Sequence, residues 1–338
     1  MKNPAILLIW VVLLFGIHML ALAADNKGLL PVNRDGFETG DWRNFRPHYA
    51  GNATDWIRPN FSINQVDPID GDFSLQWSSD DIHHHWFMLS NALYLAKPNP
   101  ARDYYFEKPA DGVIRILTYN IRNCIGMDGK TDFGRVADVI NRINPHIVAL
   151  QEVDSVTYRM NGIDVLGILA EKTNMFHSYG PAIDFQGGKY GNGVLSRDEP
   201  LSYEYIPLPG RHERRSLLMV EFKDYIIFST HLNNAFAGDR HGSVLIIDYE
   251  ARDAKKPIFL AGDINDTPGS RTLELLSENW IQLSGNEFTF PSDAPEKCID
   301  YIFGLKHNDF SYEIIRQVVV NEPVASDHLP VFVDVRIR

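Results

Sequence analysis

The chain has 338 residues, of which 44% are apolar and 22% charged, and its formal net charge at pH 7 is −12. This composition is typical of a folded globular protein. It excludes intrinsic disorder, a collagen-like repeat and a disulfide-dense scaffold, since the chain has two cysteines. The acidic balance argues against broad electrostatic adhesion to nucleic acid or an anionic membrane, and it leaves room for a local basic cleft or a bound metal ion.

The first 23 residues have the pattern of an export signal. Lys2 supplies the positive start, residues 6–17 form an apolar run, and Ala-Leu-Ala at 21–23 offers a cleavage site. The alternative is an uncleaved membrane anchor, because the apolar stretch is nearly long enough to span a bilayer. His18 inside the run and the cleavage pattern favour removal. We therefore expect a secreted or periplasmic protein.

Residues 25–97 show short aromatic-rich runs, such as those at 73–77 and 86–89, separated by Gly, Asn, Asp and Pro. This pattern predicts a small β-sandwich. Residues 35–42 resemble the first strand of secreted jelly-roll modules, many of which bind carbohydrate, so contact with a glycan or a surface is the functional hypothesis. The tryptophans serve equally well as a core, and the histidine run at 83–85 needs no metal ion.

Prolines and glycines at 98–112 predict a linker, and residues 113–338 alternate strands with helices. Expected helices lie at 133–143, 163–173, 237–252 and 270–277. Expected strands lie at 113–119, 147–150, 193–196, 202–207, 215–221, 225–230, 258–261, 299–303, 313–320 and 330–337. Because strands arrive in pairs between helices, the pattern favours an α/β sandwich over one doubly wound sheet.

Polar side chains lie at the ends of several of these apolar strands. They are Asn120, Glu152, His231, Asp263, Asn265, Asp300, Asp327 and His328. Turn capping would explain any single one, whereas the whole set predicts convergence on a cleft. The oxygen-rich donors suit a hard cation such as Mg²⁺, Mn²⁺ or Ca²⁺, and the histidines remain for proton transfer or charge stabilisation. Metal-assisted phosphoester hydrolysis is the leading hypothesis.

Seven short motifs stand in order along the second domain. They are LTYNI at 117–121, LQE at 150–152, YGNGVLSR at 190–197, STHL at 229–232, AGDIN at 261–265, IDYI at 299–302 and SDHLP at 326–330. Together they make residues 114–335 resemble the endonuclease/exonuclease/phosphatase superfamily, which includes deoxyribonuclease I, abasic-site endonucleases, neutral sphingomyelinases and inositol polyphosphate 5-phosphatases. The resemblance implies a four-layer α-β-β-α sandwich with its site at one rim of two packed sheets.

The resemblance also implies roles for individual residues, with Mg²⁺ or Mn²⁺ as the cofactor. The implied metal ligands are Asn120, Glu152, Asp263, Asn265 and Asp327, with Glu152 the principal one. The implied catalytic residues are His231, Asp263, Asn265, Asp300 and His328, of which Asp300 orients His328. The implied substrate contacts are Asn120, Asn192 and Asn234.

Some features depart from relatives or stay open. Arg122 stands where abasic-site enzymes carry an acid, and the segment after His231 lacks the long aromatic hairpin of bacterial sphingomyelinases. The basic run at 211–215 is either a solvated turn or a site for a second phosphate or other anion. Cys124 and Cys298 flank residues of the same rim, so we expect one disulfide; the alternative is two separate buried thiols.

Two functions of different classes follow. The first is a secreted, metal-dependent phosphoester hydrolase, most simply a phosphodiesterase acting on nucleic acid, a phospholipid headgroup or a sugar phosphate. The second is a non-catalytic binding protein on the same fold, with a glycan-recognising N-terminal module. A degenerate site should lack at least one of Glu152, His231, Asp263 or His328, and all are present. The sequence therefore favours the enzyme, with a phosphoester substrate and no obligate protein partner.

Overall fold

The structure is a computed structural model that describes residues 61–65, 73–77 and 104–338. The chain divides into two compact units, Met1–Lys97 and Pro98–Arg338. In the first unit, strands β1 (Phe61–Gln65) and β2 (Phe73–Trp77) pair antiparallel. The expected export signal and the rest of the expected β-sandwich lie outside the described residues. Among the residues that are described, no helix is long and apolar enough to cross a membrane.

The second unit contains two six-stranded sheets. The first runs in the order β13 (Tyr312–Val319), β14 (Val331–Ile337), β3 (Ile114–Asn120), β4 (Ile147–Ser155), β6 (Gly188–Ser196), β5 (Phe176–Phe185). The second runs in the order β11 (Trp280–Gln282), β12 (Asp300–Leu305), β10 (Ile258–Asp263), β9 (Ile226–His231), β8 (Arg215–Glu221), β7 (Ser202–Leu208). β3 pairs parallel with β4, and β9 with β10; the intervening segments contain the helices that such crossovers require.

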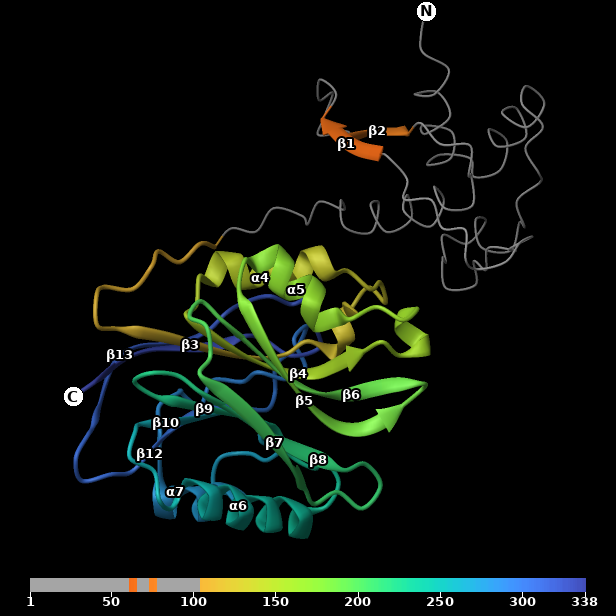
Figure 1. Ribbon diagram of the computed structural model, residues 1–338. Coiled ribbons are helices and arrows are strands. Elements are labelled where there is room, and N and C mark those ends of the chain that lie inside the picture. Colours follow the sequence, from red (N-terminus) through yellow and green to blue (C-terminus); the bar gives the residue numbers. More distant parts are fainter. Residues whose placement is uncertain (1–60, 66–72, 78–103) are drawn as a thin grey trace, which may run out of the picture. The chain divides into compact units, whose positions relative to one another are not determined.

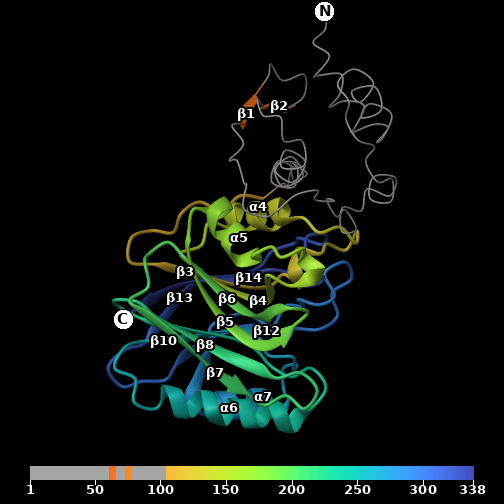
Figure 2. The ribbon, with the colours of Figure 1, turned by 45° about the vertical axis from the view of Figure 1, so that its right-hand side comes forward.

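The α-helices of the second unit cover the outer faces of its two sheets (Figures 1 and 2). On one side lie α4 (Phe133–Ile143) and α5 (Val165–Thr173), and on the other lie α6 (Ala237–Ala251) and α7 (Arg271–Asn279). Local chemistry fixes their ends. Asp132 caps α4 by accepting a hydrogen bond from the Arg135 backbone N–H, and Ser270 caps α7 in the same way through the N–H of Leu273.

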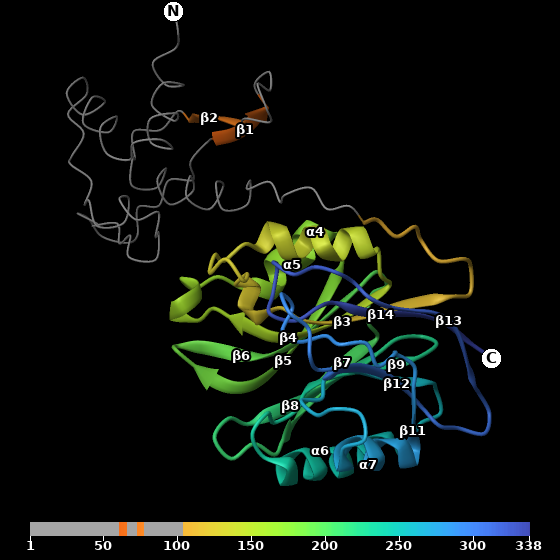
Figure 3. The same cartoon turned by 180° about the vertical axis from the view of Figure 1, so that it is seen from behind.

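The apolar core has two layers. One lies between the sheets, where Ile116 and Ala149 of the first sheet share a buried cluster with Ile227 and Phe259 of the second. The other lies between the second sheet and its helices and includes Trp280. The view from behind shows the same stacking of helices, sheet, sheet and helices (Figure 3). The unit is thus the expected four-layer α-β-β-α sandwich.

Several segments differ from the sequence-based expectation: β11 was not expected, and β4 and β6 are longer than the strands expected at 147–150 and 193–196. Strand β5 (Phe176–Phe185) was not expected, because Gly180 and Pro181 interrupt it; as an edge strand it accommodates the proline at a register shift between Pro181 and Ile183. The expected linker is packed where it is described. The Phe106 N–H donates to the Arg142 carbonyl over 2.8 Å, and its ring meets Phe332 at 4.9 Å between centroids.

Candidate active site

Strand register brings three of the expected residues together at one edge of the second sheet. Asp263 ends β10 and pairs with His231 of β9 on one side and with Asp300 of β12 on the other. All three side chains are buried. Because β10 is parallel to β9 and antiparallel to β12, the end of β10 meets the end of one neighbour and the start of the other. A carboxylate, a second carboxylate and an imidazole therefore converge by backbone pairing alone.

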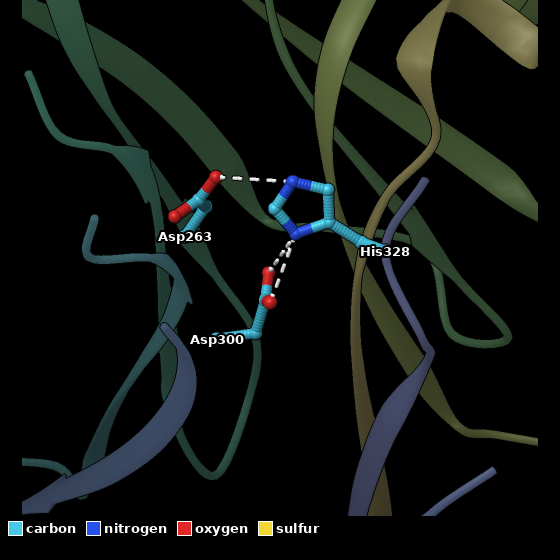
Figure 4. Close-up of side chains that lie close together, drawn as sticks. All are labelled: Asp263, Asp300 and His328. Atoms are coloured by element: carbon cyan, nitrogen blue, oxygen red, sulfur yellow. Dashed lines mark hydrogen bonds and ion pairs between the residues drawn. The ribbon is translucent and has the colours of Figure 1, made fainter. Parts of the chain in front are cut away.

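His328 reaches this edge from the segment before β14 and pairs with Asp300 (Figure 4). Its Nδ1 lies 2.9 Å from Asp300 Oδ2 and 3.2 Å from Oδ1, and the Thr289 hydroxyl also donates to Oδ2. Burial alone would lower the pKa of His328, but Asp300, aided by Asp263 and Asp327, raises that pKa to about 10. His328 is therefore an imidazolium at neutral pH, held in one orientation by Asp300.

Asp263 stands at the centre of the cluster. Its Oδ2 lies 3.4 Å from His231 Nε2 and 3.8 Å from His328 Nε2, and its Oδ1 accepts a 2.9 Å hydrogen bond from the Asn265 N–H. Burial, together with the charge of Asp300, raises the pKa of Asp263 to about 7. Near neutral pH this carboxyl can therefore give up or take a proton.

His231 has the opposite electrostatic setting from His328. Burial, with the positive charges of Arg215 and His328, holds the pKa of His231 well below its usual range. Its imidazole is neutral at pH 7, so it offers one N–H donor and one acceptor. Two histidines with pKa values driven apart are typical of a site that assigns them different tasks.

Asn120 links the two sheets across the site. It ends β3 of the first sheet, and its Nδ2 donates to Glu152 Oε1 over 3.1 Å and to Asp263 Oδ2 over 3.2 Å. The side chain is fully buried. The amide therefore fixes Glu152 on one sheet relative to Asp263 on the other.

The sequence suggested that Glu152 ends its strand, but β4 continues to Ser155. The pairing with β6 shifts register between Leu150 and Val153, and Glu152 sits in that irregularity with φ +58°. A bulge of this kind redirects one side chain out of the regular alternation. Burial, with the nearby charge of Asp327, raises the pKa of the Glu152 carboxyl above its ordinary value.

The remaining expected residues occupy different places. Asp327 is partly exposed at the mouth, 3.6 Å from the guanidinium Nε of Arg122. Asn265 is fixed by its Nδ2 donating to the Leu232 carbonyl over 3.0 Å. Asn192 is buried, and its Nδ2 donates a 2.9 Å hydrogen bond to the Ser216 carbonyl of the facing sheet. Asn192 therefore joins the two sheets. Asn234 is exposed beyond His231.

Arg215 is a site residue that the sequence left undecided. Of the basic run at 211–215, Arg211, His212 and Arg214 are exposed, whereas Arg215 is 6% exposed. Its charge acts on both Glu152 and His231. Its Nη1 pairs with Glu213, but its Nε is buried and makes no hydrogen bond with any residue that the structure describes. A buried cation beside the histidine suits an anionic ligand.

The donor set fits a divalent cation. Asp263, Asp300 and His328 offer ligand atoms that all lie within 4.8 Å of one another. Two of these three are already committed to each other, however, since the Asp300–His328 pair is the shortest contact among them. Glu152 and Asp327 add two further carboxylates, and Asn120 presents its Nδ2 to Glu152 and Asp263 while its Oδ1 accepts from the Arg122 N–H. Burial is the main cause that raises the pKa of both Glu152 and Asp263, and a hard cation bound beside them would favour their charged forms.

The expected disulfide is not present, because Cys124 and Cys298 are both free and buried. Cys298 packs into the core layer beneath α6 and α7, with Trp280 and Tyr301. Cys124 lies beside the start of α4, where its carbonyl accepts from the Asp132 N–H. Cys124 is not part of the buried cluster that contains Cys298, so nearness in the sequence to Asn120 and Asp300 did not bring the thiols together.

Comparison with known proteins agrees with this geometry. Residues 117–328 match the model of the Endonuclease/Exonuclease/phosphatase family. An endonuclease/exonuclease/phosphatase from Beutenbergia cavernae is 24% identical, with 67% of this chain and 72% of that chain covered and a TM-score of 0.54. One from Bacteroides vulgatus is 21% identical, covering 67% and 99%, with a TM-score of 0.55.

A mannosyl-6-phosphatase from Bacteroides thetaiotaomicron is 16% identical, covering 66% and 99%, with a TM-score of 0.54. At these identities the likeness to the solved structures is one of fold. No curated protein matches the sequence.

Proposed function

The chain belongs to the endonuclease/exonuclease/phosphatase family, and from this premise we propose that it hydrolyses a phosphoester with the help of Mg²⁺ or Mn²⁺. The observation that carries the proposal is the convergence of Asp263, Asp300 and His328 at one sheet edge, with Asn120 tying Asp263 to Glu152 of the facing sheet. Two sheets thus contribute to a single reaction site.

Glu152, Asn120 and Asp327 would hold the metal ion, with Asp263 and Asn265 beside it. When bound, the ion supplies positive charge to an oxygen of the scissile phosphate. The chain's own contribution is to hold these oxygens in place: the bulge at Glu152 directs its carboxylate, and Asn120 fixes the distance to Asp263. Such prepositioned groups need no rearrangement as charge develops.

Asp263 is suited to orient and deprotonate the attacking water. Its Oδ2 lies within 3.8 Å of the Nε2 atoms of both histidines, and Asn265 holds its second oxygen through a backbone N–H, so the carboxylate is fixed in position to act as a base. His328, charged and oriented by Asp300, stabilises negative charge on the phosphate as the bond breaks. Neutral His231 and the buried guanidinium of Arg215 contact the phosphate from the side of the second sheet.

The sequence favoured a phosphodiester as the substrate, and the proposal at this stage is the broader one of phosphoester hydrolysis; export after removal of residues 1–23 is proposed with it. A diester and a monoester share the P–O bond that these groups address, so the choice between them depends on contacts outside the central cluster. The non-catalytic alternative would leave the strained Glu152 bulge and the Asp300–His328 pair without a use, which favours the enzyme.

The test is a panel of p-nitrophenyl phosphate, bis-p-nitrophenyl phosphate, RNA, plasmid DNA and sphingomyelin, each with Mg²⁺, Mn²⁺ or EDTA. We expect hydrolysis of at least one ester that EDTA abolishes and excess metal restores. Activity that survives EDTA, or zinc as the required metal, would contradict the proposed ligand set. N-terminal sequencing of the protein recovered outside the cytoplasm tests removal of residues 1–23.

A further inference from the structure

One further cation stands at the mouth of the site, on Arg122. This residue begins the turn η3 (Arg122–Cys124), directly beyond β3, and its backbone N–H donates to Asn120 Oδ1 over 3.1 Å. Its guanidinium Nε lies 3.6 Å from Asp327 Oδ2, and its side chain is 42% exposed. Arg122 thus joins the site through the backbone and reaches solvent through its side chain.

The backbone of this turn is held in an unusual conformation. Arg122, Asn123 and Cys124 have φ values of +44°, +52° and +60°, three successive non-glycine residues in the left-handed region. Each such residue is strained, and strain of this kind persists where the surroundings determine it, often at functional sites. Here the surroundings are the Asn120 side chain and the buried thiol of Cys124, which is 1% exposed. The position of Arg122 relative to Asn120 is therefore fixed.

The guanidinium of Arg122 is uncommitted, in contrast to other arginines of this unit. Arg115 and Arg159 each form two hydrogen bonds to one buried carboxylate. The distance from Arg122 to Asp327 exceeds hydrogen-bond length, and the one hydrogen bond found for its guanidinium in the described chain is a weak 3.8 Å contact with Met127 Sδ. An exposed ion pair of this geometry contributes little, so an incoming anion can displace Asp327 from Arg122.

The number of cationic groups in the site influences whether it binds a phosphate monoester or a phosphate diester. A phosphodiester carries one negative charge on two terminal oxygens, whereas a monoester near pH 7 carries about −1.5 to −2 on three. The cations His328 and Arg215 provide for the charge shared by both classes, and neutral His231 offers a further hydrogen-bond donor. The third oxygen of a monoester needs another donor, and the planar fork of an arginine matches it in shape and charge.

We propose that Arg122 binds the additional terminal oxygen of a phosphate monoester, and that phosphomonoesters are the preferred substrate class of this site. This inference rests on the proposed function and narrows it. It gives Arg122, on the turn that follows β3, a direct contact with substrate, in addition to that of Arg215 at the start of β8.

The experiment compares the full-length protein with Arg122→Ala, Arg122→Lys and the control Arg271→Ala. Arg271 is a matched control because it lies on α7, is 59% exposed and pairs with Glu274. The measured quantity is kcat/KM for p-nitrophenyl phosphate divided by kcat/KM for bis-p-nitrophenyl phosphate, with Mg²⁺ present. Arg122→Ala should lower this ratio about 10- to 100-fold, Arg122→Lys should lower it less, and the control should leave it unchanged.

Calorimetric binding of inorganic phosphate gives a second readout that needs no turnover. Arg122→Ala should weaken phosphate binding at least about tenfold, with an unchanged thermal unfolding midpoint. Equal losses on both esters, or unchanged phosphate affinity, would overturn the assignment of Arg122. If the wild type binds phosphate through Arg122 yet hydrolyses neither ester under any metal, the proposed function fails and the anion site at Arg122 stands.

Discussion

Replacing Asp300 with Asn should change the protonation state of His328 without changing its place. Asn is isosteric with Asp and can still accept a hydrogen bond from the imidazole and from Thr289. It removes the negative charge 2.9 Å from Nδ1, which contributes most to raising the pKa of His328 to about 10. Burial acts in the opposite direction, while Asp263 and Asp327 still favour the charged imidazole, so the pKa of His328 should fall well below 10.

The magnitude follows from the size of that rise. An increase from 6.5 to about 10 corresponds to about 5 kcal/mol at about 1.4 kcal/mol per pH unit, and Asp263 and Asp327 share in it. We therefore expect Asp300→Asn to lower the free energy of unfolding by about 2–4 kcal/mol at pH 6. A group whose pKa is raised by folding stabilises fully below its unfolded pKa and loses that contribution as the pH rises through the folded value. The difference should shrink between pH 6.5 and 10.

The assay is NMR titration of the imidazole ring, combined with urea unfolding at several pH values in EDTA. Asp309→Asn is the matched control, because Asp309 faces His307 at 3.8 Å but is 86% exposed. The control should leave the titration of His328 and the free energy of unfolding unchanged. If His328 titrates at the same pH in Asp300→Asn as in the wild type, or if the loss of stability is independent of pH, the charge-pair reasoning is refuted.

Three further outcomes are expected. Asp263→Asn should abolish activity and, in EDTA above pH 7, raise the free energy of unfolding by up to about 4 kcal/mol. The reason is that the wild type loses stability as this buried carboxyl ionises, between its ordinary pKa of 3.8 and about 7. An unchanged pH profile of urea unfolding would contradict this. Arg215→Ala should lower kcat/KM about 10- to 100-fold at unchanged melting temperature, and a melting loss without a kinetic one would make Arg215 structural. Cys124 and Cys298 should resist a thiol reagent until urea unfolds the protein, since burial hides both thiols and raises their pKa; rapid labelling of the native state would contradict the packing.

The sequence alone predicted the fold through two signals that act locally. Apolar periodicity placed helix Phe133–Ile143 with its Asp132 cap, and polar residues after apolar runs marked the ends of β3, β9 and β10. Strand β5 escaped detection because its Gly-Pro pair reads as a turn, and an edge strand tolerates it. The register between strands determines which residues of neighbouring strands lie opposite each other, and it is a property of the assembled sheet.

The site was predictable as a set of residues and not as a geometry. Glu152 was found from its motif, but the bulge with φ +58° that aims it depends on the register shift against β6. Asn192 was expected to contact substrate, whereas the structure uses its amide to join the two sheets. The disulfide prediction was wrong because nearness in the sequence to site residues does not determine where a thiol lies in the fold. Arg215 is buried and Arg122 is exposed, and this difference could not be predicted from the sequence.

The measurement that tests the central claim most directly is the rate of hydrolysis of p-nitrophenyl phosphate and bis-p-nitrophenyl phosphate by the wild type and by Glu152→Gln. Glu152→Gln removes one carboxylate charge while keeping the side chain's size, so the fold should survive, with an unchanged far-UV spectrum and a melting temperature no lower than that of the wild type. We predict that the wild type hydrolyses at least one ester with Mg²⁺ or Mn²⁺, that EDTA abolishes this activity, and that Glu152→Gln is inactive with either metal. A folded Glu152→Gln protein with wild-type rates, or a wild type that is equally active in EDTA, would contradict a metal-dependent phosphoester hydrolase.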